Sequence, residues 1–183
     1  WTGLQCNRSI QSLRFDGCDV LLSGNIMNQM KEFFKYNGNL TKIELSECIL
    51  GDDGAHELAV ALRECTHKQS LRTVRLDDNE LRLRGLKQIV KVLMLHPNLE
   101  GLTISENNVG REGCRVLGRY LVAMKEKLKD LNVSYNRIDD VGLSLLLDGL
   151  TVRWLSSSTS SSSPWGVLGN GEHTYVGTKK SMH

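Results

Sequence analysis

The sequence contains five copies of one spaced pattern, Leu-x-x-Leu-x-Leu-x-x-(Asn or Cys)-x-Leu, in which other apolar residues replace some of the leucines. The copies begin at residues 10, 40, 71, 99 and 128, so successive copies lie 28 to 31 residues apart. The Asn or Cys position holds, in chain order, Cys18, Cys48, Asn79, Asn107 and Asn136. A glycine follows six residues later in every copy, namely Gly24, Gly54, Gly85, Gly113 and Gly142. A repeat of fixed period predicts a solenoid in which each unit packs against its neighbours.

Each copy reads as a short strand followed by a helix. Apolar residues alternate with polar ones around Val74 and Leu76, which predicts a half-buried strand. Beyond the Asn or Cys the apolar spacing changes to three and four residues, as in Ile89, Val90 and Leu93, and this predicts an amphipathic helix. Strands pack about 4.8 Å apart and helices about 8 to 10 Å apart, so the strands must line the inside of a curve. We therefore predict an α/β fold: a curved solenoid of about five repeats, with parallel β-strands on the concave face and α-helices on the convex face.

Repeats of this length, with the Asn or Cys position and a convex helix, resemble the ribonuclease-inhibitor-like class of leucine-rich repeat proteins. That class includes Ran GTPase-activating protein and the repeat domains of NLR-type receptors. The resemblance extends from residue 10 to about residue 150. It implies a scaffold that binds another protein through the concave strands and the adjoining loops.

The periodicity divides the chain into three segments. Residues 1–9 form a lead-in that begins with Trp1 and suggests a fragment, residues 10–155 form the repeat domain, and residues 156–183 form a Ser-rich tail that we expect to be disordered. We expect Val152, Trp154 and Leu155 to fold back and cover the last helix, because terminal units of a solenoid need a cap.

Composition excludes several classes of function. The net charge is +2 and charges of both signs are interspersed, so neither nucleic acid nor an anionic membrane is an expected partner. No stretch approaches the roughly 20 apolar residues of a membrane span, and no signal peptide is recognisable. The five cysteines lack Cys-x-x-Cys spacing, which argues against a zinc site or a disulfide framework. We expect reduced cysteines, a cytoplasmic or nuclear location, and neither a cofactor nor a metal ion.

The outward-facing strand and loop positions supply the candidate binding residues. Acidic residues gather along one rim with basic residues beside them, and such a surface can steer a partner that carries basic groups. Tyr135 is the aromatic among these positions and the best single anchor. The alternative is a solvated face that only keeps the sheet soluble. The partner-binding candidates are Arg14, Asp16, Glu44, Glu47, Arg75, Asp77, Asp78, Glu106, Asn132 and Tyr135.

Several other polar residues have structural interpretations. Asn79, Asn107 and Asn136 should form a buried ladder that binds loop backbone, and the repeat glycines should let each helix approach its strand. The acidic pairs before two helices, Asp52 with Asp53 and Asp139 with Asp140, should cap those helices. The histidines His56, His67 and His96 are expected on the surface or at helix ends.

No nucleophile and base can be paired in the predicted architecture, so we predict that the protein is not an enzyme. The hypothesis from sequence is a non-catalytic scaffold that binds a partner protein. Two alternatives follow from the resemblance. One is a GTPase-activating protein of the Ran type with a small GTPase as partner, and the other is the ligand-sensing repeat domain of a larger NLR-like receptor.

Overall fold

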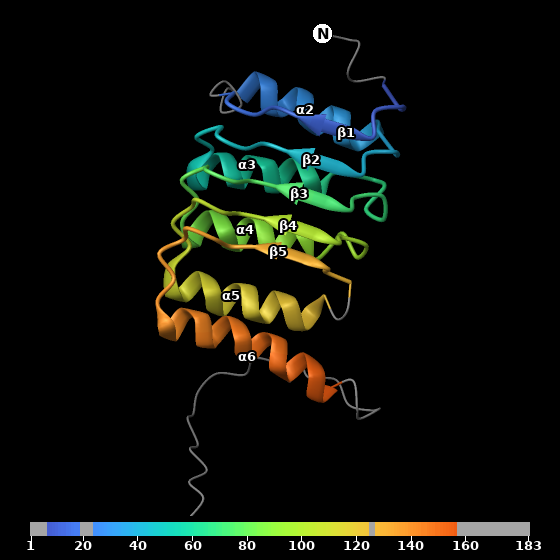
Figure 1. Cartoon of the computed structure of the whole chain (residues 1–183). Helices are drawn as coiled ribbons and strands as arrows, with labels where there is room; N and C mark the ends of the chain where they lie inside the picture. Colours follow the sequence, from blue (N-terminus) through green and yellow to red (C-terminus); the bar gives the residue numbers. More distant parts are fainter. Residues whose placement is uncertain (1–6, 19–23, 125–126, 157–183) are drawn as a thin grey trace, which may run out of the picture.

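The computed structural model of the chain describes residues 7–18, 24–124 and 127–156. Strands and helices alternate along these residues, as the repeat predicts (Figure 1). The strands are β1 (Ser12–Arg14), β2 (Lys42–Glu44), β3 (Thr73–Arg75), β4 (Gly101–Thr103) and β5 (Asp130–Asn132). The helices are α2 (Gly24–Tyr36), α3 (Gly51–Arg63), α4 (Leu83–Leu93), α5 (Gly110–Ala123) and α6 (Asp140–Ser156). The predicted α/β solenoid is confirmed.

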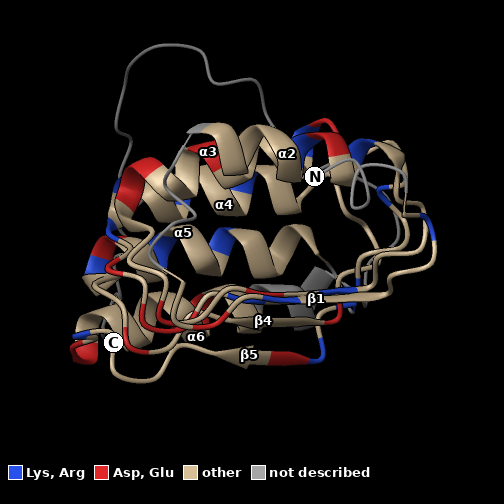
Figure 2. Cartoon of the chain, turned by 90° about the horizontal axis from the view of Figure 1, so that it is seen from above, with Lys and Arg blue, Asp and Glu red and all other residues tan. Residues whose placement is uncertain are grey.

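The five strands form one parallel sheet in the order β1-β2-β3-β4-β5. The second Leu position of each copy lies in one row across the sheet, comprising Leu13, Ile43, Val74, Leu102 and Leu131. Seen from above, α2 to α5 lie on one side of the molecule and the strands lie on the opposite side (Figure 2). Because the register is continuous, residues at one position of the repeat are neighbours across the sheet.

Aliphatic side chains fill the space between the two layers. Ile43, Leu45 and Val74 from the strand side are fully buried, and Leu58 and Ile89 from the helix side are buried as completely. The apolar positions of the repeat thus provide one continuous core, as expected for burial that drives the stacking of units.

The predicted asparagine ladder is confirmed. The side-chain nitrogen of Asn107 donates to the carbonyl oxygens of Leu76, Ile104 and Ser105, at 2.9, 3.0 and 2.9 Å. Its side-chain oxygen accepts from the N–H groups of Asn79 and Leu81, at 3.1 and 2.8 Å. Asn79 and Asn136 make equivalent bonds one repeat away on either side. Each amide therefore joins two repeats at the point where the backbone leaves the sheet.

Gly85 serves a contact between helices, so the predicted approach of helix to strand is wrong at this repeat glycine. A Cβ atom at Gly85 would lie 2.6 Å from Oδ1 of Asp52 and 3.1 Å from Cβ of Ala55, both on α3. A second close approach joins α5 to α6, where a Cβ at Gly149 would overlap the carbonyl of Gly118. Small residues at these points set how closely the helix layer can pack.

The acidic pairs divide into capping and surface residues. Oδ1 of Asp139 accepts from the N–H of Gly142 at 2.8 Å and caps α6, as predicted. Asp52 instead lies inside the first turn of α3 and caps the neighbouring helix, because its Oδ1 accepts from Arg82 at 3.0 Å and from Gly85 at 2.7 Å. The expectation that Asp52 caps its own helix is therefore wrong, and the cap stabilises the stacking of α3 on α4.

One histidine differs from the prediction. His96 is fully buried, and its Nε2 lies 3.3 Å from the carbonyl oxygen of Leu62. Burial lowers the pKa of His96 below its usual value, since the charged imidazole would lose its hydration. His56 and His67 are exposed, as predicted.

The two ends of the chain are described only in part. Helix α6 continues to Ser156, so Val152, Trp154 and Leu155 extend the helix and the prediction that they fold back is wrong. The side chains of residues 152–156 lie outside the described part, as do residues 1–6 and the Ser-rich segment 157–183. Within the described residues, no helix has the length and apolar character needed to cross a membrane.

Candidate interaction surface

Charged side chains on the strand face pair with one another. The carboxylate of Glu44 lies 2.9 Å from Nζ of Lys42 and 3.8 Å from Nη1 of Arg75. Sequence alternation predicted Glu44 as an exposed contact, but only 5% of the residue is exposed. The neighbouring long side chains cover it, so Lys42 and Arg75 form the outer surface of this part of the sheet.

Asp77 and Asp16 join neighbouring repeats. Oδ1 of Asp77 accepts from both the N–H and the hydroxyl of Ser105 at 2.7 Å, and its Oδ2 accepts from the hydroxyl of Thr103 at 2.9 Å. Asp16 makes the same kind of bond to the N–H of Ser46, at 3.2 Å. Both were candidate partner contacts, and the structure places their oxygens on the next repeat.

Arg14 pairs with the carboxylate of Asp16 on the same strand end. Burial, the largest effect, raises the pKa of Asp16, but the hydrogen bonds from Arg14 and from the Ser46 N–H, together with the positive charges of Arg14 and Arg75, outweigh it. The net result is a pKa below the ordinary value, so Asp16 is ionised at neutral pH. The strand face is thus a set of matched charges.

A row of exposed residues follows the strands and carries unmatched charge. We call Glu47, Asp78, Glu106 and Tyr135 the loop row. They occupy one repeat position, the residue before the Asn or Cys, and all four have left-handed backbone with φ from 49° to 57°. All four are exposed. In the part of the chain that the structure describes, the carboxylates of Glu47, Asp78 and Glu106 accept no hydrogen bond and form no ion pair.

Left-handed backbone costs a non-glycine residue roughly 1 to 3 kcal/mol. In the first repeat the same position holds Gly17, which adopts φ +64° without that cost. The later repeats therefore hold side chains where the backbone geometry favours glycine. This arrangement turns the three carboxylates and the tyrosine ring outward along one line of the surface.

Tyr135 ends the loop row beside a hollow at the last strand. It is 82% exposed, and the hollow, with a volume of about 490 Å³, is lined by segment 131–140 and Leu143. Asn132 lies in the same hollow, where its Oδ1 accepts from the N–H and the hydroxyl of Ser134 at 3.0 and 2.7 Å. These two candidates lie together, apart from the charged pairs of the first strands.

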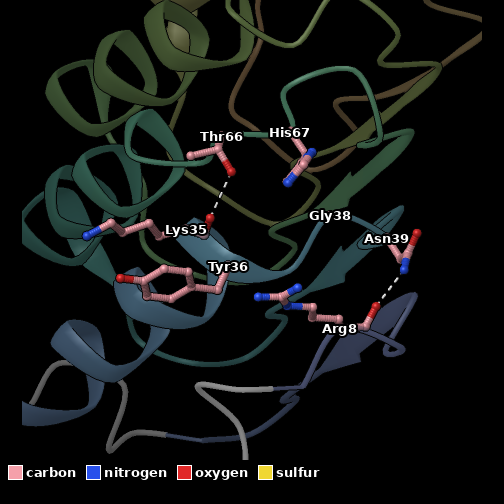
Figure 3. Close-up of a pocket in the computed structure, with 7 residues that line it drawn as sticks. All are labelled: Arg8, Lys35, Tyr36, Gly38, Asn39, Thr66 and His67. Carbon is pink, nitrogen blue, oxygen red and sulfur yellow. Dashed lines mark hydrogen bonds between the residues drawn. The ribbon is translucent and has the colours of Figure 1, made fainter.

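A second hollow was not predicted from the sequence. It has a volume of about 570 Å³ and lies between the segment before β1, the end of α2 with the loop that follows it, and the loop after α3. In Figure 3 the guanidinium of Arg8 and the ring of His67 point into the same space, while the Lys35 amine points away. Gly38 lies under the His67 ring, where an added Cβ would be 3.0 Å from its Cδ2. The lining residues come from three segments that share no motif, so the sequence offered no signal for them.

Comparison with known proteins agrees with this architecture. A family model described as Leucine Rich repeat matches residues 36–59 and 125–147. The human NACHT, LRR and PYD domains-containing protein 13 is 31% identical over 144 residues, and RAN GTPase-activating protein 2 of Arabidopsis thaliana is 33% identical over 120 residues. The repeats of this chain are leucine-rich repeats of the ribonuclease-inhibitor-like type. The resemblance seen in the sequence is confirmed.

The match to these relatives covers 79% and 64% of this leucine-rich repeat chain but only 13% and 21% of the relatives' own lengths. Two solved structures share the fold. The tropomodulin C-terminal domain of Caenorhabditis elegans superposes with a TM-score of 0.61 at 11% identity, covering 85% of this chain and 92% of that one. Leiomodin-1 Actin-Binding Site 2 gives a TM-score of 0.58 at 14% identity, with 84% and 88% covered.

Proposed function

We propose that this leucine-rich repeat protein binds a partner protein through its strand face and loop row, without catalysing a reaction. The observation that carries the proposal is the loop row, in which Glu47, Asp78 and Glu106 project unpaired from successive repeats. Adjacent strands are about 4.8 Å apart, so these carboxylates lie close enough to repel one another. A basic segment of a partner would relieve that repulsion, and this favours a cationic ligand over a neutral one.

The rest of the surface suits the same kind of partner. Tyr135 gives an exposed aromatic ring at the end of the row, where it can cover an apolar side chain of the partner. The paired charges around Glu44 offer hydrogen-bonding groups with little net charge. We therefore propose a partner segment that carries Lys or Arg residues over the row and one apolar residue over Tyr135.

A charge-neutralising variant tests the proposal. It replaces the row carboxylates with their amides, as Glu47→Gln, Asp78→Asn and Glu106→Gln, and leaves Asp77 unchanged because that side chain joins two repeats. The matched control changes three exposed carboxylates on or directly after the helices, as Glu57→Gln, Glu64→Gln and Glu112→Gln. Both variants remove three negative charges, so a difference between them reports position and not net charge.

The expected result is that a partner captured from lysate by the parent chain and by the helix variant is lost from the row variant. Titration of that purified partner should show affinity reduced about tenfold or more by the row variant, since each lost charge pair is worth about 1 kcal/mol. Affinity should also fall with added salt. Equal binding by both variants would contradict the proposal.

Similarity to RAN GTPase-activating protein 2 favours a second candidate function, in which the partner is a small GTPase and the chain accelerates GTP hydrolysis. Phosphate release from a GTP-loaded small GTPase, measured with and without the chain, separates this candidate from simple binding. A third hypothesis is that the chain is the ligand-sensing repeat domain of a larger NLR-like receptor. A nucleotide-binding module encoded in the same transcript would favour it. For all three we propose action in the cytoplasm or nucleus, which cell fractionation tests.

A further inference from the structure

The hollow of about 570 Å³ is lined by basic side chains and by no carboxylate. The guanidinium of Arg8 and the ring of His67 point into the same space (Figure 3). Within the described residues, neither of these two side chains makes a hydrogen bond or an ion pair. Both residues are exposed, so a ligand reaches them from solvent. Two hydrogen-bond donors that face one space without an acceptor favour an anion from outside the chain.

The backbone that carries Arg8 is held in place by asparagine side chains. Asn37 is 1% exposed, and its Nδ2 donates to the carbonyl oxygens of Asn7 and Ile10 at 3.0 and 3.1 Å. Nδ2 of Asn39 donates to the carbonyl oxygen of Arg8 itself at 2.5 Å. The segment before β1 is therefore fixed against the loop that follows α2, and Arg8 starts from a defined position.

The opposite wall is fixed in the same way. The hydroxyl of Thr66 donates to the carbonyl oxygen of Lys35 at 2.8 Å, which joins the loop after α3 to the end of α2. The hydroxyl of Ser70 donates to the carbonyl oxygen of His67, also at 2.8 Å. Gly38 leaves room for the His67 ring, because an added Cβ would lie 3.0 Å from it. Fixed walls reduce the entropy that a ligand loses on binding.

The hollow lies on the cationic edge of the solenoid. This edge consists of the described loops that lead from a helix to the next strand, together with the segment before β1. Their anionic residues are Glu64 and Glu100, and their cationic residues are Arg8, Lys68, Arg72, Lys127 and Lys129. The loop row lies at the other ends of the strands and carries carboxylates. The summed field therefore attracts anions toward the hollow and away from the loop row.

We propose that this hollow binds an organic phosphate, with phosphate oxygens on the Arg8 guanidinium and on the His67 ring. A phosphate ester carries three acceptor oxygens and nearly two charges at neutral pH, so one group can bind both side chains. A carboxylate has only two oxygens and one charge. Residues 1–6, which precede Arg8, contain no Asp or Glu that could take the place of the ligand.

The size of the hollow indicates a ligand larger than phosphate alone. Its volume lies in the range of about 300 to 1,000 Å³ that sites for small molecules have. Tyr36 lines the same hollow and is 46% exposed, so it offers apolar surface beside the two donors. The organic part of the ligand would cover the Tyr36 ring while the phosphate binds Arg8 and His67.

Calorimetric titration of the full chain with phenyl phosphate, at low salt and without phosphate buffer, tests the proposal. We expect one molecule to bind, and Arg8→Ala and His67→Ala should each weaken its binding about tenfold or more, since each removes a charge-assisted hydrogen bond. The matched controls are Arg119→Ala on α5 and His56→Ala on α3, which remove exposed side chains of the same types away from the hollow. Both controls should bind phenyl phosphate like the parent.

Two further variants separate the parts of the site. Arg8→Lys keeps the charge but loses the planar fork, so it should bind with intermediate affinity, and it serves as the second variant should Arg8→Ala disturb the fold. Inorganic phosphate should bind the parent more weakly than phenyl phosphate does, and Tyr36→Ala should abolish that difference.

Three results would overturn the proposal: no binding of phenyl phosphate to the parent at millimolar concentration, equal binding by the parent and Arg8→Ala, or equally tight binding of benzoate. The outcome is independent of partner binding by the loop row. The variant with Glu47→Gln, Asp78→Asn and Glu106→Gln should bind phenyl phosphate like the parent, so failure of one proposal leaves the other standing.

Discussion

Removing the Asn107 side chain should destabilise the protein by an amount that can be worked out from its hydrogen bonds. In Asn107→Ala the N–H groups of Asn79 and Leu81 lose the side-chain oxygen that they bind at 3.1 and 2.8 Å. Both groups lie in buried residues, and a buried donor left without a partner costs about 1 to 3 kcal/mol. The expected loss is therefore about 2 to 6 kcal/mol, from two such donors.

Urea unfolding followed by circular dichroism measures this loss, and the midpoint is the safest quantity because a solenoid can unfold in steps. Asn108→Ala is the matched control. Asn108 is half-buried, and its side chain makes no hydrogen bond within the described residues, so its removal should change stability by less than about 0.5 kcal/mol. Asn107→Cys should fall between the two, because the Cys48 thiol donates to the Phe15 carbonyl at the same repeat position.

One outcome would refute the reasoning. If Asn107→Ala and Asn108→Ala shift the urea midpoint equally, the amide of Asn107 does not bind the two buried N–H groups. The assignment of the ladder, and with it the register of the loops after each strand, would then be wrong.

Two further predictions concern packing and pH. Gly149→Ala should cost about 1 to 3 kcal/mol in unfolding experiments, because the new methyl group meets the Gly118 backbone, whereas Gly101→Ala should be nearly neutral since its nearest neighbour atom is 3.4 Å away. Burial lowers the pKa of His96 in the folded protein below the value of about 6.5 in the unfolded chain. As the pH falls below about 6.5, the unfolded chain takes up a proton before the folded one does, so the free energy of unfolding decreases until the pH reaches the lower, folded-state pKa. Thermal unfolding between pH 7.5 and 5.5 should show a smaller loss for His96→Gln than for the parent, while His56→Gln should behave like the parent.

The parts of the structure that sequence predicted are those fixed by position in the repeat. Ile43, Val74 and Leu102 align across the sheet because each unit repeats the same contacts, and a single count of residues places all of them. The burial of Asn107 follows in the same way, since every unit leaves the sheet at the same point. Periodicity fixes which face of its unit a residue occupies, and burial of the apolar face then determines how the units stack.

The choice of partner for each polar side chain could not be predicted in this way. Alternation placed Glu44 and Asp77 on the outer face, but it could not tell that Lys42 covers the first or that Ser105 binds the second. Those partners lie in specific repeats and not in all of them, so the pattern carries no signal for them. Asp52 shows the same limit, because its hydrogen-bond partner Gly85 belongs to the next unit.

Contacts of this kind give the solenoid a direction. Past each strand, N–H groups of one repeat donate to carbonyls of the following repeat, as Leu76 does to Thr103 at 2.8 Å. Asp77 and Asp52 likewise reach forward to the next unit. The N–H groups that follow a strand are therefore held by the carbonyls of the next unit, and removing one unit leaves those of the unit before it without their acceptors. This explains why the stability of each repeat depends on its neighbours and not on its own sequence alone.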